Sequence, residues 1–173
     1  MEIIRISKER IGELLGKNGE NAKRIEQHYN VKIKVDEEGE VFIAGEGGST
    51  FFAKDVVQAI GRGFPIEDAV KLFKDSYAFY AVDLRERFPS ENAIKRVKGR
   101  VIGEKGKIKR EIEDAAGAKI SVYGHTVSII APHDSMECAK EAISKIMDGA
   151  PHTTVLNYLR RAKGRLLAER LKG

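Results

Sequence analysis

Apolar and polar positions along this chain switch between a period of two and a period near 3.6, and the switches come in a fixed order. Ile3, Ile4 and Ile6 open an alternating run that predicts a half-buried strand, and Ile11 and Leu14 follow at helical spacing. Two glycines then break the helix. The first part of the chain is therefore expected to contain strand 3–6, helix 11–15, helix 21–29, strand 31–35, strand 41–44 and helix 50–60.

The second half of the chain repeats this pattern in register, 87 residues later. Residues 15–19, with the sequence LGKNG, reappear as residues 102–106, IGEKG, so both copies read aliphatic-Gly-x-x-Gly. A shared register over 28 positions indicates two copies of one folding unit with α+β structure. The same offset pairs Ile25 with Ile112, Ile33 with Ile120, Val35 with Val122 and Ile43 with Ile130.

The second copy carries additions that the first copy lacks. Pro65 is placed to begin a short linker helix, and a basic helix interrupted by Gly99 is expected before the second glycine turn. Pro151 precedes a tail helix. The expected division is residues 1–62 as the first domain, 63–76 as a linker helix, 77–150 as the second domain and 151–173 as a C-terminal helix.

Two helices are expected to be amphipathic. The helix 50–60 should turn Phe52, Val56, Val57 and Ile60 inward. The tail helix has an apolar stripe that needs a cover, either the second domain or a partner. The stripe consists of Leu156, Leu159, Leu167 and Leu171.

Composition removes several classes of protein. No apolar stretch of about 18 residues occurs and the N-terminus lacks the zones of a signal peptide, so a soluble, cytoplasmic protein is expected. The one cysteine, Cys138, reads as a small buried hydrophobe. The four histidines have no metal-ligand spacing, and residues 12–17 fall short of a nucleotide-binding loop. We therefore expect no metal, no cofactor and no enzymatic activity.

The charge is segregated along the chain in a way that the net value of +5 conceals. Residues 36–92 carry six Lys/Arg against twelve Asp/Glu, whereas residues 95–110 carry eight cations and one anion, Glu104. This basic run surrounds a glycine turn that can expose backbone N–H groups. Phosphate is the partner that suits both features.

An aliphatic-Gly-x-x-Gly turn between two helices, within the order strand-helix-helix-strand-strand-helix, resembles the KH module in its type I arrangement. Two such modules follow one another here. The basic run of residues 94–103, together with residues 119–124 and the linker residues 63–69, closely resembles the archaeal members of the partner-of-NOB-one family of small-subunit ribosome assembly factors. The resemblance implies binding to single-stranded rRNA near the 3′ end of the small-subunit rRNA, alongside the endonuclease that matures this end. Contact with translation-initiation machinery is also expected.

The KH resemblance also assigns the binding residues. The glycine turns would clamp the nucleotide backbone, nearby cations would contact phosphates, and aliphatic side chains would form the floor of a base groove. Glu104 is a departure, because it places an anion inside the second turn, and an acidic cluster at residues 36–40 weakens the prediction for the first unit. The expected RNA-binding residues are Leu15, Gly16, Lys17, Asn18, Gly19, Ile25, Ile33, Lys98, Arg100, Ile102, Gly103, Glu104, Lys105, Gly106, Lys107, Lys109, Arg110, Ile112 and Ile120.

Two other functions stay open at this point. The chain could be a KH adaptor that binds mRNA or RNA-decay machinery. It could also be a protein scaffold in which the acidic segment 36–92 and the tail helix recruit partners and contact with RNA is incidental. The absence of Trp and the low aromatic content favour a KH-type groove over a sheet surface that stacks bases.

Overall fold

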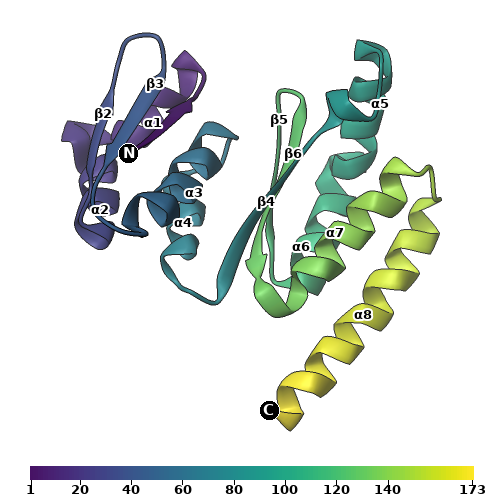
Figure 1. Cartoon of the computed structure of the whole chain (residues 1–173). Helices are drawn as coiled ribbons and strands as arrows, with labels where there is room; N and C mark the ends of the chain where they lie inside the picture. The colour runs from purple at the N-terminus through teal and green to yellow at the C-terminus, as the bar shows by residue number, and fades with distance from the viewer. The chain divides into compact units, whose positions relative to one another are not determined.

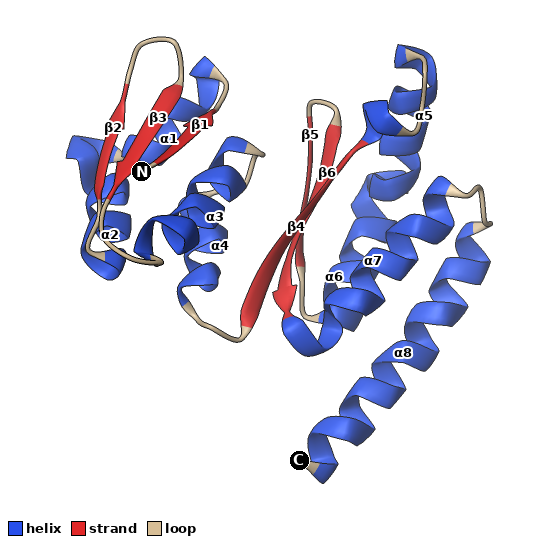
Figure 2. Ribbon diagram, viewed as in Figure 1, coloured by secondary structure: helices blue, strands red, loops and turns tan.

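The computed structural model describes all 173 residues, and these divide into two compact units, Met1–Asp75 and Ser76–Gly173. Figure 1 shows the path of the chain through both units. Each unit has one three-stranded antiparallel sheet with helices against it (Figure 2). The predicted α+β class, with two tandem units in the order βααββα, is confirmed.

Unit 1 builds its sheet in the order β1-β3-β2. The register pairs Ile4 with Val41 and Ile33 with Ile43, so the apolar alternation of each strand falls on one face. Helices cover this face, and Leu14 and Ile25 are fully buried there. The elements of unit 1 are β1 Glu2–Arg5, α1 Ile11–Leu15, α2 Glu20–Tyr29, β2 Lys32–Val35, β3 Glu40–Ala44, α3 Ser49–Gly61 and α4 Ile66–Ala69, with short 3-10 turns at Lys8–Arg10, Lys17–Gly19 and Val70–Phe73.

Unit 2 repeats the sheet order as β4-β6-β5 and adds a long last helix. That helix, α8, packs against both α6 and α7. Ile112, Ile129 and Ile143 are central members of one core that the sheet and the helices share. The elements are β4 Tyr77–Asp83, α5 Glu91–Ile102, α6 Lys107–Ala116, β5 Lys119–Tyr123, β6 Thr126–Pro132, α7 His133–Met147 and α8 His152–Lys172, with 3-10 turns at Leu84–Glu86 and Glu104–Gly106.

The inner faces of two helices differ from those expected. Phe52 is 57% exposed, and Ala53 takes the expected inward place beside Val56 and Val57 on α3. On α8 the expected stripe is wrong in its second half, because Leu167 and Leu171 are 52% and 88% exposed. The buried stripe of α8 runs through Val155, Leu159, Ala162 and Leu166.

The basic helix before the second glycine turn is continuous. The predicted interruption at Gly99 is wrong, since α5 runs unbroken from Glu91 to Ile102. The Ser90 hydroxyl accepts a hydrogen bond from the Ala93 N–H at 3.1 Å and so caps the start of this helix. Burial of Ile94, Val97 and Val101 on one face holds the helix against unit 2, which outweighs the low helix propensity of one glycine.

Candidate nucleic-acid interface

The two Gly-x-x-Gly turns have the same backbone conformation. Three of the four residues in each turn have positive φ, and the values agree between the turns within a few degrees. In unit 1, φ is 71° at Gly16, 57° at Asn18 and 75° at Gly19; in unit 2 it is 76° at Gly103, 54° at Lys105 and 74° at Gly106. The sequence repeat is therefore a repeat of backbone geometry, and it places the same chain path before α2 and before α6.

The first glycine of each turn is required by packing. A Cβ on Gly103 would lie 2.6 Å from Ile108 Cγ1 and 2.9 Å from the Ile108 nitrogen. A Cβ on Gly16 would lie 2.5 Å from Asn21 Cγ. Each first glycine therefore lets the turn lie directly against the helix that follows.

The second glycine of each turn faces open space. No atom lies within 4 Å of a Cβ built on Gly19, and only Arg110 Nη1, at 3.2 Å, approaches one built on Gly106. Neither glycine provides a side-chain cap, so the first N–H groups of α2 and α6 have no side-chain acceptor. Each ten-residue helix thus begins at an open, partly positive end that a phosphate can approach.

The predicted cations of unit 2 divide into free and engaged groups. Lys105 and Lys107 are exposed, and Lys98 and Lys109 are half-buried. Arg110 donates from Nη1 to the Lys105 carbonyl at 2.7 Å, which holds the second turn from behind. The side chains next to the turn that remain available to a phosphate are therefore Lys105 and Lys107, with the exposed anion Glu104 beside them.

Arg100 is engaged elsewhere. Its Nη1 donates to the Ile146 carbonyl at 2.7 Å, and its Nη2 donates to the Ala150 carbonyl, at the end of α7. We therefore assign Arg100 to holding α7 in place. In unit 1, Arg10 has the corresponding role, because it donates to the carbonyls of Ile60 and Phe64 at the end of α3 at 2.8 and 2.7 Å.

The predicted floor residues lie at different depths. Leu15 and Ile102, one residue before each turn, are 37% and 36% exposed and present apolar surface beside the glycines. Ile33 is half-buried. Ile25 and Ile112 are fully buried and Ile120 nearly so, which places these three in the cores. They support the groove from beneath, and direct contact with a base is left to the shallower side chains.

A pair of glutamates that the sequence analysis did not select fixes the floor strands. Glu26 Oε2 accepts a hydrogen bond from the Ile33 N–H, and Glu113 Oε2 accepts one from the Ile120 N–H, both at 2.9 Å. Glu26 and Glu113 are themselves 87 residues apart. The repeat offset was the signal that could have identified them.

The acidic hairpin of unit 1 is partly neutralised by its own contacts. Asp36 Oδ1 accepts hydrogen bonds from the N–H groups of Glu38 and Glu40, both at 2.9 Å. Glu38 also forms an ion pair with Lys8 at 3.2 Å. Lys17 and Asn18 in the first turn are exposed, as are Lys32 and Lys34 on β2.

Other chemistry-bearing groups do not gather into a second site. No group of three or more His, Cys, Asp or Glu side chains is arranged to hold a metal ion. Cys138 is buried, and burial raises the pKa of its thiol. No helix is both long and apolar enough to cross a lipid bilayer.

Comparison with protein-family models matches both units. Residues 78–164 match a model for the second KH domain of PNO1, described as "Eukaryotic type KH-domain (KH-domain type I)". Residues 1–59 match the model described as "KH domain". The two matches cover the two glycine turns and the sheets on which they are mounted.

Three relatives extend the match over the whole chain. KH domain-containing protein MJ0443 of Methanocaldococcus jannaschii is 40% identical over 99% of this chain and 78% of its own length. Pre-rRNA-processing protein PNO1 of Chaetomium thermophilum is 32% identical over 68% of this chain, which spans just under half, 45%, of that longer protein. A crystal structure of an a/eIF2alpha-aDim2p-rRNA complex from Pyrococcus horikoshii OT3 contains a chain 40% identical, with a TM-score of 0.86 and coverage of 95% of this chain and 94% of that one.

A family match over half of the chain and 40% identity over nearly all of it lead to one assignment. The chain belongs to the PNO1/Dim2 family of tandem KH-domain, rRNA-processing proteins.

Proposed function

We propose that this protein is an RNA-binding factor of ribosome biogenesis that holds a single strand of rRNA at its Gly-x-x-Gly turns. The observation that carries the proposal is the shared backbone of the two turns, each with an open second glycine at the start of a ten-residue helix. Membership of a family whose relatives are named for pre-rRNA processing supports it, as does similarity to a chain in a complex with rRNA.

In the proposed complex, the phosphate backbone lies against the turn, where glycine has no side chain to keep it away. The N–H groups at the start of α6 and the ammonium groups of Lys105 and Lys107 would meet the phosphates. Bases would lie over the apolar surface of Ile102 and the neighbouring β5 strand. Unit 2 has the stronger collar of cations, so we assign it the main contact.

We further propose that the bound strand is the 3′ region of the small-subunit rRNA. A strand held in extended form would be presented to the endonuclease that matures this end, and to translation-initiation machinery in the cytoplasm. The family assignment and the relative whose complex includes a/eIF2alpha and rRNA support this finer proposal. The role is binding and presentation, and the proposal assigns the protein no catalytic step.

The test is a binding titration with Gly106→Asp and its neutral match, Gly106→Asn. Both variants place a short side chain at the same positive φ, but only aspartate adds charge where the phosphate would lie. We expect Gly106→Asp to lose roughly ten- to hundredfold in affinity for a single strand from the small-subunit rRNA 3′ end, because a charge-assisted contact is replaced by repulsion.

The titration is repeated with a scrambled strand and at several salt concentrations. Affinity should fall steeply with salt, since binding releases counterions from the strand. A folded Gly106→Asp protein that binds as tightly as Gly106→Asn would remove the turn from the site. Equal affinity for the rRNA and scrambled strands would leave a general single-strand clamp and contradict the finer proposal.

A further inference from the structure

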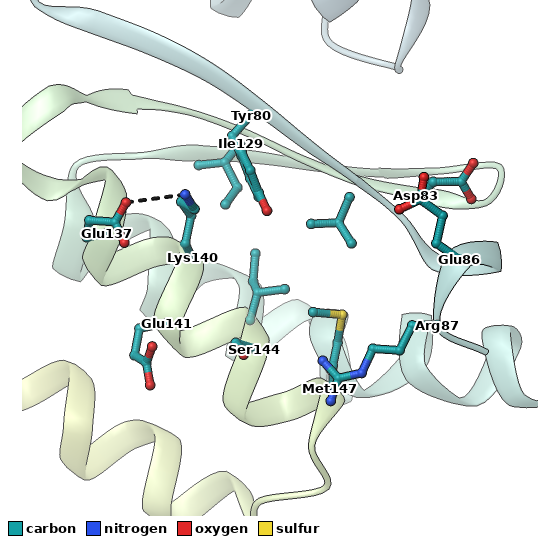
Figure 3. Close-up of a pocket in the computed structure, with 12 residues that line it drawn as sticks. Tyr80, Asp83, Glu86, Arg87, Ile129, Glu137, Lys140, Glu141, Ser144 and Met147 are labelled. Atoms are coloured by element: carbon teal, nitrogen blue, oxygen red, sulfur yellow. Dashed lines mark hydrogen bonds and ion pairs between the residues drawn. The ribbon is translucent and has the colours of Figure 1, made fainter.

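Unit 2 has a groove between β4 and α7, apart from the glycine turn (Figure 3). Its volume is about 510 Å³, and its walls combine an apolar floor with a charged rim. A cavity of this size accommodates several side chains. The floor consists of Val82, Ile129, Ile143 and Met147.

The strand beside this groove is the edge of its sheet, and its pairing shows which backbone groups are free. β4 pairs only with β6. Leu84 N–H donates to the His125 carbonyl at 2.7 Å, and His133 N–H donates to the Ser76 carbonyl at 2.8 Å. Successive residues of an antiparallel strand turn alternately toward and away from the partner strand. Tyr80 therefore bonds to β6, whereas Phe79 and Ala81 direct their N–H and C=O groups to the open edge.

This edge lacks the usual protection against strand addition. Natural edge strands carry charged residues or proline, or are very short. In unit 1 the edge strands are four residues long, with Glu2 and Arg5 on β1 and Lys32 and Lys34 on β2. β4 has seven residues and neither charge nor proline from Tyr77 to Val82. Ala81 is exposed, so the edge is accessible at its centre.

A strand added at this edge would place its side chains in the groove. Side chains alternate between the two faces of a sheet, and Tyr80 and Val82 of β4 both line the groove. Every second side chain of an added strand would fall on that same face. Main-chain hydrogen bonds and a pocket for alternate side chains are the two elements of peptide recognition by strand addition.

The rim of the groove favours a basic partner. It has four carboxylates but only two cations, and both cations are engaged. Lys140 Nζ lies 4.3 Å from the centre of the Tyr80 ring and 3.2 Å from Glu137, and Arg87 pairs with Asp148. Glu86 is exposed and forms no hydrogen bond or ion pair. The carboxylates are those of Asp83, Glu86, Glu137 and Glu141.

We propose that the open edge of β4 binds an extended segment of a protein partner in which apolar side chains alternate with lysine or arginine. The segment adds a fourth strand to the sheet of unit 2, its apolar side chains enter the groove, and its cations face the rim carboxylates. No residue of this site belongs to the glycine turn, so the site is independent of the RNA contact and extends the proposed function to a partner protein.

The test uses the full chain, labelled with ¹⁵N, and a blocked seven-residue peptide of alternating arginine and valine. We expect the amide signals of Phe79 and Ala81 to shift more than that of Tyr80. Ala81→Pro removes an outward N–H without removing a bond to β6, and it should lower affinity about tenfold. Glu86→Lys should also weaken binding, whereas the same change at exposed Glu169 on α8 should not.

Further measurements keep the proposal open to contradiction if Ala81→Pro does not fold. Ser144→Phe fills the groove from α7 and leaves the β4 backbone unchanged, so it too should weaken peptide binding. Unchanged affinity in folded Ala81→Pro or Ser144→Phe would overturn the proposal. Equal binding of a glutamate-valine peptide would overturn it as well. A protein that sediments as a dimer through β4 would assign the edge to a second copy instead. RNA affinity measured alongside is expected to stay unchanged by Ala81→Pro, which separates this site from the proposed function.

Discussion

The two glycine turns share one backbone but differ in the side chains around it. The turn of unit 1 has Asn18 at its central positive φ and packs its first glycine on Asn21, whereas the turn of unit 2 has Lys105 and packs on Ile108. The basic collar surrounds only the second turn. Geometry is therefore common to both units, and the difference in charge and packing decides how much each turn can contribute to binding RNA.

The difference in packing gives the largest expected effect. Gly103→Ala and Gly16→Ala both place a side chain at positive φ with ψ near 180°, which costs about 2 kcal/mol. Gly103→Ala should cost about 2 kcal/mol more, because the new Cβ meets branched Ile108 and its backbone nitrogen. Asn21 can instead swing away, at the loss of its 2.8 Å bond to the Glu13 carbonyl. Denaturant-dependent amide exchange measures each unit separately, and equal losses would contradict the packing difference.

The two arginines that hold the last helix of each KH unit form the next comparison. Arg10→Ala and Arg100→Ala each remove hydrogen bonds from a guanidinium to two carbonyls, so each should lower the free energy of unfolding of its unit by about 2 kcal/mol. RNA affinity of the folded Arg100→Ala protein should change less than about threefold. A large loss of affinity with normal stability would return Arg100 to the RNA-binding residues.

The central residues of the turns can be exchanged. Lys105→Asn should raise the stability of unit 2 by about 0.5–1 kcal/mol, because asparagine tolerates the left-handed region better than lysine does. Asn18→Lys should lower the stability of unit 1 by a similar amount. Thermal unfolding of the two variants measures both changes. The gain in stability from Lys105→Asn should accompany weaker RNA binding, since a phosphate contact is lost.

The smallest effect concerns alkaline pH. Burial, with smaller contributions from the carboxylates of Asp55 and Asp75, raises the pKa of Tyr29 from 10.0 to about 12. The native state then holds the phenol proton more tightly than the unfolded state, so the contribution is complete below pH 10 and is lost as pH rises toward 12. Tyr29→Phe should flatten the alkaline decline in unfolding free energy, measured by denaturant titrations at several pH values. An unchanged slope would show that Tyr29 does not cause it.

Much of this molecule could be predicted from the 87-residue repeat. Because apolar spacing and turn glycines recur in register, the element order and both turns followed from the sequence. The rotation of a helix about its axis did not. Leu166 and Leu167 are equally apolar, and only packing of α8 against α6 and α7 decides that Leu166 is buried. The same holds for Phe52 and Ala53 on α3.

The engagement of individual charges was also beyond the sequence. A run of cations around a glycine turn indicates phosphate binding but does not show that Arg100 caps α7 or that Arg110 holds the Lys105 carbonyl. These bonds join residues of distinct elements, and they form only when the fold brings a carbonyl within reach. The groove beside β4 was missed for the same reason, because its walls come from three segments of unit 2.

The most direct test of the central claim compares one substitution at equivalent positions. Gly19→Asp and Gly106→Asp add the same charge at φ values of 75° and 74°, each next to open space, and Gly19→Asn and Gly106→Asn control for the backbone. Affinity for the rRNA 3′ strand should fall by at least about tenfold in Gly106→Asp and by less than about threefold in Gly19→Asp. Equal losses, or a larger loss in Gly19→Asp, would contradict the assignment of the main RNA contact to unit 2.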